Sequence, residues 1–157
     1  GTTAIQANDL VGRKTARDGG TGAKSIAAQI ARTEAELLAS PNADAQAMGK
    51  RLKAAREAFI DVVDFIAANT KSNPNAAFSG SVPYLLLTGN LVAGWQMGRA
   101  LLVALTPEAQ AQDAAFMAAK VTTARFYGDH ILSKVPGMRD AIVEGADSVT
   151  ALPLDAF

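Results

Sequence analysis

The most apolar continuous stretch of the sequence is the run from Ser81 to Leu105, SVPYLLLTGNLVAGWQMGRALLVAL. Pro83 suits the first turn of a helix, where its missing N–H leaves no bond unmade. Asn90, Gln96 and Arg99 would be costly in hydrocarbon, so the run predicts the central helix of a folded core rather than a membrane span. Apolar residues cover nearly the whole circumference, as in a helix buried on most sides: Leu85, Leu86, Val92, Leu101 and Leu102.

Two glycines inside this run, Gly94 and Gly98, are four positions apart and share one face of the helix. In lipid this spacing would suggest helix dimerisation. In a helical bundle it allows a neighbouring backbone to approach closely. We therefore expect a close helix crossing at these two positions.

Periodic apolar residues predict further helices on both sides of the central one. The clearest pattern lies in residues 41–69, where one stripe continues at steps of four and three: Met48, Leu52, Ala55, Phe59, Val62 and Ile66. Other patterns indicate helices over residues 24–39, 107–133 and 138–152. No segment alternates convincingly with period two. The fold class is therefore all-α: an antiparallel up-and-down bundle of four to five main helices, preceded by a short N-terminal helix.

Turn-forming residues separate these helices. Ser40–Pro41 and Thr106–Pro107 each combine an N-cap residue with a first-turn proline. Residues 72–80, SNPNAAFSG, predict a connecting turn. The glycine-rich stretch Asp18–Gly22 lacks a preceding strand and the lysine of a phosphate-binding loop, so we interpret it as a flexible linker.

Composition narrows the classes of function. Fifteen basic and fifteen acidic residues cancel, which argues against nucleic acid as a partner. The absence of cysteine excludes disulfides, thiolate zinc sites and cysteine nucleophiles. No secretory signal is visible, and we expect a cytoplasmic location. The sequence opens on Gly1 rather than methionine, which favours a fragment or a processed product.

The residues themselves offer little catalytic chemistry. A di-iron carboxylate site requires Glu-x-x-His pairs, yet the single histidine, His130, has no glutamate three positions before it, so no metal site is expected. A hydrolytic triad is unsupported because no serine lies in a Gly-x-Ser-x-Gly turn. We expect His130 to be hydrogen-bonded at the edge of the core near Tyr127 or Asp129. A hydrogen-bonded polar cluster is expected within the bundle, with a ligand-facing Trp95 as the alternative: Asn90, Trp95 and Gln96.

The opening of the sequence, GTTAIQANDLVGRK, resembles the end of the catalytic core of acyl-CoA dehydrogenases, where a Glu-Gly-Thr-x-x-Ile-Gln sequence leads into the last core helix. The matching residues are Gly1, Thr2, Ile5 and Gln6. Two later stretches, SGSVPYLLLTGNLVAGWQMGRALL and DAAFMAAKVTTARFYGDHIL, resemble the extra C-terminal helical domain of one branch of that family. This branch includes dehydrogenases for long-chain and sulfur-containing acyl-CoA thioesters. The resemblance implies that residues 1–18 are the tail of the catalytic core and residues 19–157 the C-terminal bundle domain.

The resemblance also implies the chemistry. In the family, a glutamate abstracts the α-proton of an acyl-CoA while the β-hydrogen leaves as hydride to FAD. That glutamate immediately precedes the Gly-Thr pair, so it would lie one residue before Gly1, and no catalytic residue is expected in this chain. Gly1 and Thr2 are the residues implied at the cofactor. Ala4 stands where some members have a glutamine near the cofactor.

The implied partners are the rest of the dehydrogenase chain, an acyl-CoA substrate in the full enzyme, further copies in a homo-oligomer, and electron-transfer flavoprotein as acceptor. FAD is expected in the full-length enzyme and not on the isolated chain, which should be inactive. The alternative hypothesis is a stand-alone helical domain for protein interaction or oligomerisation. The GTTAIQ opening argues against it, because a free-standing adaptor has no use for the tail of a flavin site.

Overall fold

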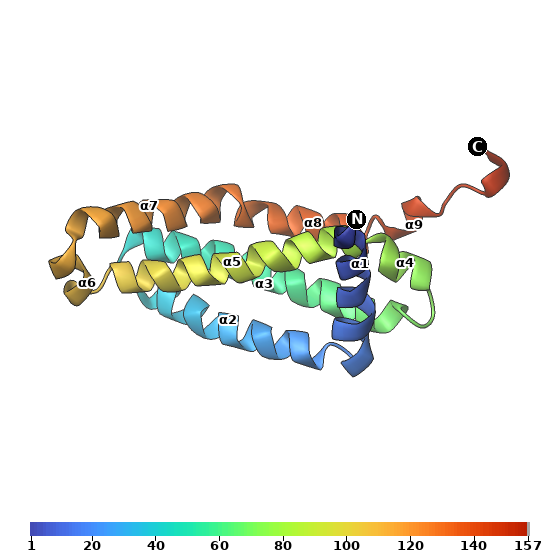
Figure 1. Ribbon diagram of the computed structural model, residues 1–157, viewed down its shortest axis with the longest axis horizontal. Coiled ribbons are helices and arrows are strands. Elements are labelled where there is room, and N and C mark those ends of the chain that lie inside the picture. The colour runs from blue at the N-terminus through green and yellow to red at the C-terminus, as the bar shows by residue number, and fades with distance from the viewer. Residues whose placement is uncertain (157) are drawn as a thin grey trace.

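The computed structural model describes residues 1–156, so the last residue of the expected 19–157 domain lies outside the described part. Four long helices run alternately up and down beside one another (Figure 1): α2 (Thr21–Ala39), α3 (Ala43–Asn69), α5 (Ser81–Ala104) and α7 (Ala114–His130). No strand occurs in residues 1–156. The predicted all-α, up-and-down bundle is therefore confirmed.

Shorter elements close the two ends of the bundle. The α-helical ones are α1 (Thr2–Asp9), α4 (Pro74–Ser79), α6 (Pro107–Gln112), α8 (Val135–Val143) and α9 (Ala146–Val149). A π-helical segment, Leu10–Thr15, continues α1, and single 3₁₀ turns cover Ala16–Asp18, Leu132–Lys134 and Leu154–Ala156. In Figure 1, α1 and α4 lie at one end and α6 at the other, while α8 extends the line of α7. The expected short N-terminal helix is therefore present.

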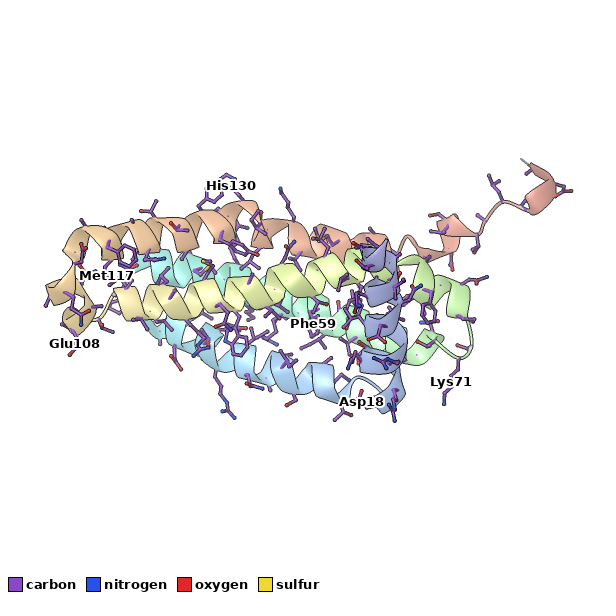
Figure 2. All side chains as sticks on the ribbon, viewed as in Figure 1. Asp18, Phe59, Lys71, Glu108, Met117 and His130 are labelled. Atoms are coloured by element: carbon purple, nitrogen blue, oxygen red, sulfur yellow. The ribbon has the colours of Figure 1, made fainter. Side chains whose placement is uncertain are left out.

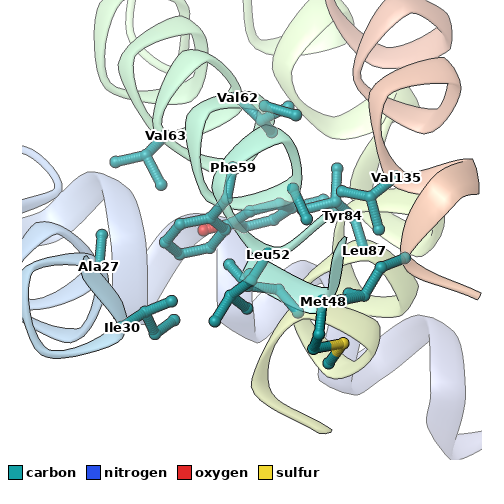
Figure 3. Close-up of a cluster of buried hydrophobic side chains, with 14 of the residues drawn as sticks. Ala27, Ile30, Met48, Leu52, Phe59, Val62, Val63, Tyr84, Leu87 and Val135 are labelled. Atoms are coloured by element: carbon teal, nitrogen blue, oxygen red, sulfur yellow. The ribbon is translucent and has the colours of Figure 1, made fainter. Parts of the chain in front are cut away.

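Helix α3 supplies the central layer of the core. All six residues of its predicted apolar stripe are buried, the most exposed being Phe59 at 3%. Figure 3 shows side chains of α3 packed between Ile30 of α2, Tyr84 and Leu87 of α5, and Val135 of α8. Burying each large apolar side chain contributes about 1.5–3 kcal/mol, so this layer is the main source of stability in the bundle.

Asn42 begins α3, two positions later than predicted. Its side-chain oxygen accepts hydrogen bonds from the N–H groups of Asp44 and Ala45, at 2.9 and 3.1 Å. The predicted cap, Ser40, instead accepts a hydrogen bond from the N–H of Asn42, at 3.2 Å. The prediction was wrong because an amide at position 42 satisfies two first-turn donors that a hydroxyl at position 40 cannot reach.

Residues 72–80 form more than the turn that their composition predicts. Asn73 accepts a hydrogen bond from the N–H of Ala76 at 3.3 Å, and Pro74 occupies the first turn of α4. Ala76 and Ala77 of this short helix are buried. Asn73 and Pro74 therefore start a helix, and the predicted turn is wrong for this part of the segment.

The helix predicted over residues 107–133 is two helices. Its start is confirmed, because Thr106 accepts a hydrogen bond from the N–H of Ala109 at 3.3 Å. At Asp113 the backbone is extended (φ −159°, ψ 90°), and the carboxylate accepts a hydrogen bond from the N–H of Phe116 at 2.9 Å. Asp113 therefore ends α6 and caps α7.

The final helix predicted over residues 138–152 is also displaced. It begins at Val135, with Pro136 in its first turn, and ends at Val143 before the short α9. Ile142 is buried as expected, whereas Val149 is 64% exposed. Proline is compatible with a first turn, so Pro136 starts this helix instead of separating it from the previous one.

Helix α5 matches the predicted central helix, but it is not buried on most sides. Its inner side, including Leu87, Leu91 and Leu101, is at most 1% exposed. On the outer side Leu86 and Val103 are 55% and 61% exposed. The long helices α3 and α7 pack against the inner side, which accounts for the difference. No helix within residues 1–156 is long and apolar enough to cross a membrane.

Gly94 and Gly98 both lie on the inner side of α5. A Cβ atom at Gly94 would be 2.6 Å from Cδ2 of Leu132, and one at Gly98 would be 2.9 Å from Cδ1 of Leu37. The two glycines therefore make room for neighbouring leucine side chains. The predicted close approach is present, but a side chain and not a neighbouring backbone comes close.

The stretch Asp18–Gly22 is an ordered turn, not a flexible linker. Gly19 and Gly20 have φ angles of 65° and 83°, a conformation that glycine adopts at little cost. The Asp18 carboxylate accepts hydrogen bonds from the N–H groups of Gly20 and Gly22, at 3.0 and 2.9 Å. The aspartate thus fixes the first turn of α2.

Candidate functional site

Gly1 and Thr2, the residues implied at the cofactor, lie at the exposed start of α1. No side chain caps this helix, so the first-turn N–H groups have no partner within the helix. A Cβ atom at Gly1 would meet nothing within 4 Å. The N–H groups at the start of α1 suit contact with one polar edge of a flavin. Because they are exposed, they could not enclose the flavin. Their role stays a prediction.

The remainder of α1 is held against the bundle. Ala4 and Gln6 are exposed beside Thr2, whereas Ala7 and Val11 are fully buried. Helix α1 packs against α5 and lies across its first turns (Figure 1). The position of the N-terminus is therefore fixed relative to the central helix.

A buried pair of hydroxyl groups anchors the end of this N-terminal segment. Oγ1 of Thr15 and the phenolic oxygen of Tyr84 are hydrogen-bonded at 2.9 Å, and each residue is 1% exposed. The ring of Phe59 stacks on Tyr84, with 6.1 Å between the ring centroids. Burial raises the pKa of the Tyr84 phenol above its ordinary value. Tyr84 is therefore neutral at neutral pH and acts as an anchor, not as a base.

A cavity of about 270 Å³ lies next to this pair. Leu10, Ile26 and Tyr84 are among its lining residues, and Lys14 is the one charged residue. Neither a carboxylate nor a histidine lines it. The cavity can accept a small apolar group, but its lining offers no acid–base pair.

A groove of about 420 Å³ lies between α5 and α7. Ala100 and Val103 of α5 and Phe116 of α7 form part of its wall. Arg99 and Lys120 also line it, each placed over an aromatic ring. The groove therefore combines an apolar surface with two cations and contains no carboxylate.

Glu34 is the one buried carboxylate among the described residues, and Arg56 neutralises it. The guanidinium group donates two hydrogen bonds to the two carboxylate oxygens, at 2.7 and 3.3 Å. The hydrogen bond to Glu34 raises the pKa of the Arg56 guanidinium group. A carboxylate in a two-pronged ion pair is a poor general base, so the pair joins α2 to α3 without catalytic consequence.

The expected polar cluster does not form. Trp95 donates from its indole N–H to Oγ1 of Thr33 at 2.9 Å, whereas Gln96 accepts from Arg99 at the surface, also at 2.9 Å. Asn90 donates only to the sulfur of Met138, at 4.0 Å. These side chains point to different neighbours because consecutive helical positions diverge by about 100°. The bond to Thr33 also turns the Trp95 N–H toward α2.

His130 lies exposed on the outer side of α7 (Figure 2). Its ring centroid is 4.5 Å from that of Phe126. The expected position at the edge of the core, near Tyr127 or Asp129, is therefore wrong, since the ring lies against an exposed aromatic side chain. No group of three or more metal-ligating side chains is assembled within residues 1–156.

Sequence reasoning missed two contacts that hold helices of the bundle together. Thr15–Tyr84 and Glu34–Arg56 join residues far apart in the chain, so no local spacing reveals them. One signal was present: Tyr84 stands in an otherwise apolar run, and a buried tyrosine requires a hydrogen-bond partner. That signal predicts a partner without identifying it.

Comparison with known proteins identifies the family, which the side-chain chemistry of the described residues does not. A sequence model described as "Acetyl-CoA dehydrogenase C-terminal like" matches residues 23–153. The 3-methylmercaptopropionyl-CoA dehydrogenase of Ruegeria pomeroyi is 44% identical over 98% of the chain and 26% of its own length. The broad-specificity linear acyl-CoA dehydrogenase FadE5 of Mycobacterium tuberculosis is 30% identical over 100% of the chain and 27% of its own length.

The chain thus spans about a quarter of the length of these curated relatives. The family match covers most of α2 and every later helix of the bundle, and the alignments with the relatives extend over the N-terminal segment as well. The expected family is confirmed. The chain belongs to the acyl-CoA dehydrogenase family, as its acetyl-CoA dehydrogenase C-terminal-like helical domain.

Proposed function

We propose that the chain is the C-terminal part of an FAD-dependent enzyme that oxidises an acyl-CoA thioester across its Cα–Cβ bond. The names of both relatives support an acyl-CoA as substrate. The observation that carries the proposal is the resemblance of Gly1, Thr2, Ile5 and Gln6 to the end of the catalytic core. Gly1 precedes α1, and the other three residues lie on it. Residues 1–18 then continue that core, and residues 19–157 form an accessory bundle.

The chain's own contribution is positional. When bound, FAD accepts the β-hydrogen as hydride. Gly1 and Thr2, whose N–H groups are uncapped, would contact an edge of the flavin through those groups and the Thr2 hydroxyl. The anchor between Thr15 and Tyr84 fixes the helix that carries them. The base that removes the α-proton is the carboxylate directly before Gly1.

The partners follow from the same proposal. Electron-transfer flavoprotein would be the electron acceptor of the full enzyme, and the full protein would form a homo-oligomer. A stand-alone interaction domain is less well supported, because both relatives carry this region as about a quarter of a longer dehydrogenase.

The test compares the full gene product with the 157-residue chain. The full product is expected to be yellow and to lose its flavin absorbance on mixing with an acyl-CoA under anaerobic conditions. Replacing the carboxylate before Gly1 by glutamine should abolish this reduction while FAD remains bound. Thr2→Val is the matched control, which should shift the flavin spectrum but retain reduction.

The isolated chain should fold, purify colourless and show no acyl-CoA oxidation with added FAD. One flavin per isolated chain would overturn the proposal. An upstream sequence without a dehydrogenase core, or without a carboxylate before Gly1, would do so equally.

A further inference from the structure

The outer side of α5 carries an apolar stripe with the spacing of a helix-packing seam. Its members follow one another at steps of three and four, with one step of seven across Gln96: Val82, Leu86, Gly89, Ala93, Ala100 and Val103. The three large side chains of this outer stripe are 45%, 55% and 61% exposed. Steps of three and four keep residues on one face, so the outer stripe is a single continuous surface.

The helix beneath this stripe is nearly free of charge. Arg99 is the one charged residue in Ser81–Ala104. A helix that keeps one side in water normally carries charged residues there, as α3 does with Lys50, Lys53 and Glu57. A long exposed apolar face without charges marks an interaction surface.

Two positive charges stand at the far end of the outer stripe. Arg99 lies over the Trp95 ring at 5.8 Å, and Lys120 lies over the Phe116 ring at 4.9 Å. Neither cation is paired with a carboxylate in residues 1–156. Both line the groove of about 420 Å³ that Val103 helps to form. A surface that carries both apolar side chains and carboxylates would therefore be complementary to this end of the outer stripe.

The course of the chain indicates which occupant this is. Helix α1 packs against α5, and Figure 1 shows the N-terminus at the end of the bundle where α5 begins. The part of the protein before Gly1 therefore starts from the end of α5 whose first turns carry Val82 and Leu86. Ile5 of α1 is itself 67% exposed. The relatives devote about a quarter of their length to this region. We propose that the outer stripe of α5 is the surface on which the preceding part of the same dehydrogenase chain packs, with carboxylates facing Arg99 and Lys120.

This inference rests on the proposed function, and it is tested in the full gene product. Cysteine is placed at the two ends of the stripe, Leu86→Cys and Val103→Cys, and on α9 as a control, Val149→Cys, whose parent residue is 64% exposed. A water-soluble maleimide labels each thiol, and mass spectrometry of the labelled peptide gives the rate. Each rate is compared with the rate of the same variant in urea.

The thiols at positions 86 and 103 are expected to react at least about tenfold more slowly in the native protein than in urea, since they are covered. The control thiol at position 149 should react at nearly its unfolded rate. Native labelling within tenfold of the unfolded rate at position 86 or 103 would overturn the inference.

The occupant is identified by a photo-crosslinker, Leu86→p-benzoylphenylalanine, in protein assembled from a mixture of ¹⁴N and ¹⁵N chains. Crosslinks to residues before Gly1 within a single isotopic chain support the proposal. Mixed-isotope crosslinks would show that a second copy covers the stripe, and an absence of crosslinks would show that nothing does. Either result overturns it.

The flavin content and the reduction by acyl-CoA are measured on the same preparations. A yellow, reducible protein with unprotected thiols would contradict the packing surface and leave the proposed function standing. A colourless full product would contradict the proposed function itself.

Discussion

The side-chain oxygens of Thr15 and Tyr84 lie 2.9 Å apart, although 69 positions separate the two residues in the chain. Thr15 ends the π-helical segment that follows α1, and Tyr84 stands in the first turn of α5. Both residues are buried, and this hydrogen bond gives each hydroxyl a partner away from water. This contact fixes the N-terminal segment, which bears the residues implied at the flavin, to the central helix.

Tyr84→Phe should lower the free energy of unfolding of the chain by about 1–3 kcal/mol, because it leaves the Thr15 hydroxyl buried without its partner. Urea unfolding followed by circular dichroism measures the change. Thr15→Val and the double variant complete a double-mutant cycle, in which the two losses should be clearly non-additive. Additive effects would mean that the hydroxyls do not interact.

Alkaline pH should destabilise the fold through the same residue. Burial raises the pKa of Tyr84 in the folded state above the ordinary 10.0, so the folded state holds this proton more tightly than the unfolded state does. The stabilisation is thus fully present below about pH 10 and is lost as the pH rises through the folded-state pKa. Unfolding free energies from about pH 8 to about pH 11 should fall more steeply in the parent chain than in Tyr84→Phe. Parallel curves would contradict the prediction.

Glu34→Gln should cost about 1–3 kcal/mol, since it removes the charge that Arg56 faces in a largely buried position. Asp64→Asn provides the matched control, because Asp64 pairs with Lys24 in an exposed bridge. That change should stay within about 0.5 kcal/mol. Thermal and urea unfolding of both variants measure the two changes in unfolding free energy. Equal losses of stability would contradict the distinction between the buried and the exposed ion pair.

Gly98→Leu should lower stability by about 1–3 kcal/mol, because a Cβ there already lies 2.9 Å from the buried Leu37 side chain. The same substitution at Gly89, where an added Cβ meets nothing within 4 Å, should be neutral or stabilising by up to about 1 kcal/mol. Melting temperatures of the two variants in the 157-residue chain give the comparison. A stabilised Gly98→Leu variant would show that the bundle opens easily at this crossing.

The sequence was most informative where burial and periodicity coincide. The stripe on α3 was predicted residue by residue because that helix lies at the centre of the bundle and contacts most other helices. Leu86 was expected to be buried, yet it is 55% exposed, because an apolar residue in a sequence does not show what covers it. An apolar pattern in the sequence predicts that a residue is buried in the complete protein. The surface that buries it can belong to a part of a longer protein outside this domain.

Breaks between helices were harder to predict from the sequence than the buried faces of helices. Asp113 interrupts a helical pattern without any proline or glycine beside it, and its capping role depends on a backbone conformation that the sequence does not display. The role of Gly1 and Thr2 came from the family resemblance alone and stays a prediction. The anchoring pairs were missed because partners distant in sequence are brought together by packing.

Asn42 and Asp113 cap the starts of α3 and α7. Each long helix packs on the next long helix along the chain: α2 on α3, α3 on α5 and α5 on α7. Contacts between consecutive helices close short loops, so little chain entropy is lost before each pair of helices gains its packing energy. An up-and-down arrangement of this kind is expected to fold on a timescale on the order of microseconds to milliseconds. During synthesis, each new helix could then dock as it emerges, without waiting for the C-terminus.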